Sequence, residues 1–196
     1  MIIDASLGRA NCCGYPCGMP QPPVPPFPPP VPQPPVPDTI QIQLANAQTG
    51  IAGGAVIPLN TVLRQTGNGL SFNPATGAFT VADAGVYAID WTVLVQPAGE
   101  GAAADPLPAL VIALQSLDGR TVLGYAGIPS AAAADGAQLT GRAVAALPAG
   151  SSWVLVNASG ETIDVPLAGT APAAFAAQLT VAELAAPTAS APRPFA

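Results

Sequence analysis

Residues 70–95, LSFNPATGAFTVADAGVYAIDWTVLV, decide the expected fold. Two short β-forming segments are joined at residues 73–77 by Asn-Pro and Thr-Gly pairs, which are typical of turns. A second turn at residues 82–85 is followed by a longer segment in which every second residue is large and apolar. Those large residues are Tyr87, Ile89, Trp91, Val93 and Val95. The period of two predicts a strand, and because Tyr87 and Trp91 offer the most buriable area, we expect this strand to organise the core.

The order of several short motifs resembles the tumour-necrosis-factor/complement-component-1q jelly-roll superfamily. The motifs are Phe79-Thr80-Val81, then Gly85-Val86-Tyr87 with an aromatic four residues later, and the segments 51–60, 66–69, 153–157 and 177–181. The most similar members are the heads of collagen-like glycoproteins on bacterial spore surfaces. The resemblance covers about residues 39–186 and implies an all-β sandwich of about ten strands that assembles as a trimer, a jelly roll.

The composition is apolar and poor in charge. Half of the residues are hydrophobic and only 8% are charged, with a net charge of −6, no His and no Lys, whereas soluble domains usually carry about 25% charged residues. Either the sequence is simply biased towards Ala, or large surfaces are buried between subunits. The absence of a basic cluster argues against nucleic-acid binding. No apolar run approaches ~18 residues, so we expect no membrane span.

Residues 1–19 form a Cys/Gly segment that holds all three cysteines: Cys12, Cys13 and Cys17. Cys12 and Cys13 are adjacent and cannot easily pair with each other, because a trans peptide fixes their Cα atoms ~3.8 Å apart and a disulfide needs more than ~4.4 Å. We therefore expect disulfides between chains, with free thiols and a shared metal site as alternatives. The start of the chain does not resemble a secretory signal, because it lacks a basic stretch followed by a long apolar one.

Residues 20–37 contain 12 prolines in 18 positions. Proline removes a backbone donor and fixes φ, so the segment is expected to form a polyproline II rod of ~55 Å, at ~3.1 Å per residue. It departs from the spore-glycoprotein pattern, in which a collagen-like stalk follows the leader, because no Gly occurs between Gly18 and Gly50. The regular spacing of Val24, Phe27 and Val31 suggests a rod that docks on something; a plain linker is the alternative.

The composition changes abruptly at Asp38, so we expect a jelly-roll domain at 38–186 and a Pro/Ala tail at 187–196. Within the domain, residues 50–54 read as a loop and 55–59 as a short strand. Residues 107–117 and 121–128 read as a hairpin, and 175–184 as the last strand. We expect Tyr87, Trp91 and Phe175 to lie in the core or along a trimer axis.

The sequence offers no obvious catalytic site, cofactor site or metal site. Without His or Lys, and with every Cys near the N-terminus, the common nucleophile–base pairs are missing. The pairs Asp83/Asp90 and Asp118/Asp135 read as turn residues, except that Asp90 lies in a strand. Asp90 could pair with Arg64, Arg120 or Arg142, face solvent, or bind a cation.

Two further motifs are weak. Some members of the resembled superfamily bind calcium in apical loops, but Glu100 and Asp105 match no calcium motif. Asn157-Ala158-Ser159 fits the N-glycosylation triplet, which matters only in a secretory pathway.

The layout of thiols, rod and head predicts a structural fibre subunit and not an enzyme. In this hypothesis trimers join head-to-tail through residues 1–37, and the cysteines lock the joint. Such a contact does not close, so it grows filaments. The resemblance places the fibre on a spore surface, with an anchor protein and a tip protein as further partners. The alternative is a stalked trimeric adhesin whose head binds a ligand.

Overall fold

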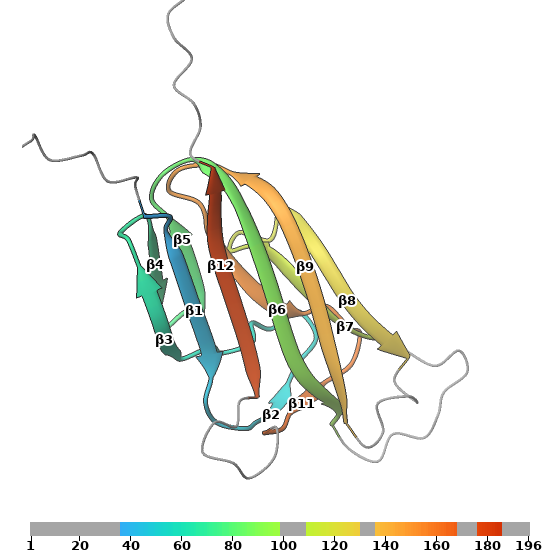
Figure 1. Ribbon diagram of the computed structural model, residues 1–196. Helices are drawn as coiled ribbons and strands as arrows, with labels where there is room; N and C mark the ends of the chain where they lie inside the picture. The colour runs from blue at the N-terminus through green and yellow to red at the C-terminus, as the bar shows by residue number, and fades with distance from the viewer. Residues whose placement is uncertain (1–35, 99–108, 130–135, 168–175, 186–196) are drawn as a thin grey trace, which may run out of the picture. The chain divides into compact units, whose positions relative to one another are not determined.

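The structure is a computed structural model that describes residues 36–98, 109–129, 136–167 and 176–185 (Figure 1). The described part contains twelve β-strands and no helix, so none of it could cross a membrane as an apolar helix. The strands are β1 (Thr39–Leu44), β2 (Gln48–Ile51), β3 (Thr61–Thr66), β4 (Leu70–Asn73), β5 (Ala78–Val81), β6 (Gly85–Pro97), β7 (Ala109–Ser116), β8 (Val122–Pro129), β9 (Ala137–Leu147), β10 (Ser152–Asn157), β11 (Ile163–Val165) and β12 (Ala177–Ala185).

The strands form two antiparallel sheets. The seven-stranded sheet has the order β2-β11-β6-β12-β1-β3, with β9 also paired to β6, and the five-stranded sheet has the order β4-β5-β10-β7-β8. Figure 1 shows β1, β12, β6 and β9 running side by side in front of the second sheet. The expected all-β sandwich is confirmed, with twelve strands in the described part where about ten were expected.

The central strand β6 behaves as its sequence pattern predicts. Its large residues at odd positions from Tyr87 to Val95 are buried, and they lie in one continuous core with residues of both sheets. The even positions Asp90, Thr92 and Leu94 are exposed or half-buried. The alternation arises because successive side chains of a strand point to opposite faces of the sheet.

Turn chemistry sets the strand boundaries where the sequence indicated. The Asn73 carbonyl accepts hydrogen bonds from the amides of Thr76 and Gly77, and the Asn73 side chain accepts one from Ala75. Gly77 has a φ of 67°, a conformation that glycine adopts without strain. This turn joins β4 to β5, so the expected pair of short strands is confirmed.

One local expectation was wrong. Residues 50–54 were expected to be a loop and 55–59 a strand, but β2 extends to Ile51 and pairs with β11. In residues 55–59 a single bridge joins Val56 to Val156. The amide of Ile57 bonds to the Leu155 carbonyl at 2.8 Å, so the segment borders β10 without becoming a full strand.

β1 begins and β12 ends at the same end of the domain, because they are antiparallel neighbours in which Thr39 pairs with Ala182. We call this end the terminal end. The turns that precede β6 and follow β9 also lie there, since Gly85 pairs with Leu147. Segments 1–35 and 186–196 therefore join the domain at the terminal end.

Candidate assembly surface

Tyr87 and Trp91 are buried inside the domain. Tyr87 is fully covered, and its hydroxyl donates a hydrogen bond of 2.9 Å to the carbonyl of Asp83. Burial raises the pKa of Tyr87 above its usual 10.0, and the carboxylates of Glu183, Asp38 and Asp83 add to this effect. The ring therefore anchors the turn before β6, and a neutral hydroxyl is favoured in the folded state. Phe175, the third aromatic singled out, lies outside the described residues.

Trp91 fills the seam between the two sheets. Its side chain is 1% exposed and lies against Gly141 of β9 and Gly124 of β8, the edge strands of the two sheets. A Cβ at Gly141 would overlap the indole ring, and a Cβ at Gly124 would come within 3.0 Å of it. Among the described residues, the indole Nε1 has no hydrogen-bond partner. The sequence gives no hint of these two contacts, because a glycine in a strand looks only like a weakening residue.

The outer face of the seven-stranded sheet is the side of β9, β6, β12, β1 and β3 that points away from the core. Strand register arranges its side chains in rows. One row runs Val144, Ala88, Ala182, Thr39, Thr66; the next runs Arg142, Asp90, Thr180, Gln41, Arg64; and a third runs Thr140, Thr92, Gln178, Gln43, Thr61. These fifteen positions carry only three charges, and two of them are paired. The outer face is thus broad and nearly neutral.

Asp90 pairs with Arg142, one of the three arginines proposed from the sequence. The two residues lie directly opposite in β6 and β9, and Arg142 Nε is 3.2 Å from Asp90 Oδ1. The Asp90 side chain is 51% exposed and the Arg142 side chain is 70% exposed, so solvent screens the interaction. Exposed pairs of this kind contribute about 0–1 kcal/mol to stability. Their main effect is to neutralise the middle of the outer face.

The outer face becomes apolar towards the terminal end. Val86, Val144 and Leu184 are 36%, 59% and 58% exposed. Beside them is a shallow hollow, almost wholly apolar, between the turn before β6 and the turn after β9; its lining includes Gly85, Val86 and Pro148. Exposed aliphatic side chains grouped in this way are typical of protein interaction surfaces.

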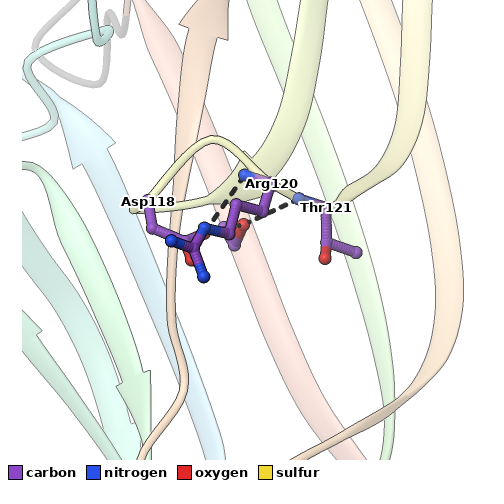
Figure 2. A network of polar contacts seen from close by, with 4 residues as sticks. Asp118, Arg120 and Thr121 are labelled. Atoms are coloured by element: carbon purple, nitrogen blue, oxygen red, sulfur yellow. Dashed lines mark hydrogen bonds and ion pairs between the residues drawn. The ribbon is translucent and has the colours of Figure 1, made fainter.

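Asp118 belongs to a structural turn, as expected of an acid between two strands (Figure 2). Its Oδ1 accepts hydrogen bonds from the Ser116 hydroxyl at 2.6 Å and from the Arg120 amide at 3.1 Å. The Ser116 hydroxyl in turn accepts one from the Thr121 amide. The hydrogen bond from Ser116 contributes most to lowering the pKa of Asp118 below its usual 3.8, and the hydrogen bond from the Arg120 amide adds to this effect. Arg120 lies 3.5 Å from the same carboxylate, so it is not a partner for Asp90.

Asn157 is completely buried, so the glycosylation triplet is a structural feature in the folded domain. Its side-chain nitrogen donates to the carbonyls of Ile51 at 2.9 Å and Glu161 at 2.8 Å. Its side-chain oxygen accepts from the amide and hydroxyl of Ser159. Asn157 thereby ties β10 to β2 and to the turn before β11.

Within the described ranges, no group of three or more His, Cys, Asp or Glu side chains could hold a metal ion. Several residues of interest lie outside those ranges. They are Cys12, Cys13, Cys17, Val24, Phe27, Val31, Glu100, Asp105 and Asp135. The roles predicted for the cysteines in disulfides, and for Val24, Phe27 and Val31 in arm docking, stay predictions.

Comparison with known proteins establishes the fold. Neither a family model nor a curated protein matches the sequence. Solved structures similar to the domain include the Eiger TNF of S. frugiperda, with 15% identity and a TM-score of 0.55, covering 82% of this chain and 99% of that one. Another is the globular domain of zebrafish complement 1qA, with 14% identity and a TM-score of 0.52, covering 76% and 98%. The chain has the jelly-roll fold that these TNF and complement 1q proteins share.

Proposed function

We propose that three copies of the domain assemble through the outer face of the seven-stranded sheet. The observation that carries this proposal is the chemistry of that face: rows of Ala, Thr and Gln, one internal ion pair, and exposed Val86, Val144 and Leu184. Burying such a face removes apolar area from water and desolvates few charges. A trimer also accounts for the low charge of the whole sequence.

The trimers then join head-to-tail into a fibre. Residues 1–37 of one trimer reach the head of the next, with Val24, Phe27 and Val31 as docking residues, and Cys12, Cys13 and Cys17 cross-link the joint. A stiff segment is suited to this role because little conformational entropy is lost when it binds. The resemblance to spore-surface glycoproteins supports a spore-surface fibre, attached by an anchor protein and ended by a tip protein.

Negative-stain electron microscopy tests the fibre. Full-length protein is expected to form filaments, and a variant lacking residues 1–37 is expected to give separate particles. Filaments formed by the shortened variant would show that the arm is not the connector. Separate stalked particles from the full-length protein would favour the adhesin instead.

A second test concerns the cysteines. Filaments are expected to resist heat and detergent, and dithiothreitol is expected to weaken that resistance, because the joint then depends on non-covalent contacts alone. A matched variant with all three cysteines changed to Ser should behave like the reduced protein. Identical resistance with and without dithiothreitol would remove the disulfides from the proposal.

A further inference from the structure

Tyr125 is an exposed aromatic residue on the other side of the molecule. It lies on β8, an edge strand of the five-stranded sheet, and is 64% exposed. The other large apolar residues exposed in the described part are all Val or Leu. The inward neighbour Ala126 belongs to the core, so the Tyr125 side chain points away from the core.

The surface around Tyr125 is flat and carries no charged side chain. Tyr125 pairs across the strands with Ala113, which is buried, and the exposed Gly127 pairs with the half-buried Val111. A Cβ at Gly127 would come within 3.3 Å of the Val111 side chain, so the glycine leaves the surface flat beside the tyrosine. We call the surface formed by Tyr125, Gly127 and Val111 the Tyr125 shelf. It offers one upright aromatic ring beside small apolar groups, and it contains no charged side chain.

We propose that the Tyr125 shelf binds the proline-rich segment 20–37 of another copy of this chain. Polyproline II segments dock on aromatic surfaces, where proline rings pack against the aromatic faces. Their carbonyls have no internal hydrogen-bond partner, and a tyrosine hydroxyl can donate to one. Segment 20–37 has 12 prolines and no charged residue, which suits the shelf better than the outer face with its Asp90 and Arg142.

The length of the segment is compatible with this contact. As polyproline II, 18 residues span ~55 Å, whereas the 13 residues of β6 span about 43 Å along the domain. A segment that arrives from a neighbouring trimer can therefore pass along a whole head, and a shelf in the middle of β8 is within its reach. This inference rests on the proposed head-to-tail joint and adds the surface on which the joint forms.

Photo-cross-linking of the full-length protein tests the proposal. Tyr125→p-benzoylphenylalanine keeps an aromatic ring on the shelf, and the same substitution at Val62, an exposed residue of β3 on the other sheet, is the matched control. Filaments are assembled from a mixture of isotope-labelled and unlabelled chains and then irradiated. Mass spectrometry is expected to join position 125 of one copy to residues 20–37 of another, with little capture from position 62.

Cross-links from position 125 to other parts of a head, or only to the same copy, would overturn the proposal, as would equal capture from position 62. If filaments form while the cross-links map elsewhere, the shelf assignment fails and the head-to-tail joint stands. Wild-type protein that never grows beyond single trimers would overturn both.

Two substitutions at Tyr125 measure independently how much its ring contributes to filament growth. Tyr125→Ala is expected to raise the protein concentration needed for filament growth about tenfold, because a central aromatic contact is lost. Tyr125→Phe retains the ring and should change that concentration by less than about threefold. Both variants should keep the wild-type thermal unfolding midpoint, because the ring is exposed. Filament growth by Tyr125→Ala at the wild-type concentration would contradict the proposal.

Discussion

Alternate residues of β6 face opposite sides of the seven-stranded sheet, and the two sides differ in burial and in polarity. The inner side presents Tyr87, Ile89 and Trp91 to a dry core, while the outer side presents Asp90, Thr92 and Leu94, which are exposed or half-buried. The difference teaches that one strand serves two purposes. Inner residues determine whether the domain folds, and outer residues are available for assembly.

The largest effect is expected on the inner side. Trp91→Ala should lower the free energy of unfolding by about 3–5 kcal/mol, because it removes the ring that fills the seam and leaves a cavity. Chemical denaturation followed by circular dichroism measures this loss. The matched control is Thr92→Ala on the outer side, which should change stability by less than about 0.5 kcal/mol. Equal losses of unfolding free energy for the two variants would contradict the difference between the inner and outer sides of β6.

Gly141→Ala should cost about 1–3 kcal/mol, since the added methyl group overlaps the indole of Trp91. The cost depends on the ring, so it should largely vanish when Trp91 is replaced by Ala in the same chain. A double-mutant cycle measures this coupling. A cost that persists without the indole would show that Gly141 is needed for another reason.

Tyr87→Phe should cost about 1 kcal/mol at neutral pH, because the hydrogen bond to the Asp83 carbonyl is lost. The raised pKa of Tyr87 also predicts alkaline behaviour. The folded state holds the proton more tightly than the unfolded state, so the stabilisation is complete below pH 10 and is lost as pH rises through the folded pKa. Denaturation at increasing pH should show a shallower alkaline decline for the Phe variant; parallel curves would exclude Tyr87 as the cause.

The smallest effect is expected on the outer side. The Asp90–Arg142 pair should contribute about 0.2–1 kcal/mol in a double-mutant cycle with Asp90→Asn and Arg142→Gln. The coupling should fall as salt is added, because exposed charges are screened. The cycle is measured at a dilution that leaves single chains, because assembly through the outer face would cover the pair. A coupling of several kcal/mol that salt does not change under those conditions would contradict the exposure of the pair in the single chain.

Much of the fold can be predicted from the sequence because strand periodicity and turn residues are local signals. The alternation from Tyr87 to Val95 and the turn at Asn73 both gave correct boundaries. Residues 55–59 were misassigned because a short segment becomes a strand only where a neighbouring strand can pair with it, and intrinsic β propensity does not decide this. The placement of Trp91 against Gly124 and Gly141, and the rows of the outer face, could not be predicted, because they depend on register between strands distant in sequence.

The candidate surfaces could be predicted from the sequence less well than the core. Asp90 was recognised as unusual because it lies in a strand, yet the choice among three arginines needed the pairing of β6 with β9. Tyr125 carries no signal in the sequence, since an aromatic residue in a strand is more often buried. Its exposure follows from the inward orientation of its neighbour Ala126, which only the pairing of β7 and β8 determines.

The measurement that tests the central claim most directly is native mass spectrometry of the full-length protein at micromolar concentration in reductant. Assembly through the outer face predicts that the smallest abundant species has three times the 19.3 kDa mass of one chain. A spectrum dominated by the single chain would contradict the trimer and every proposal that builds on it.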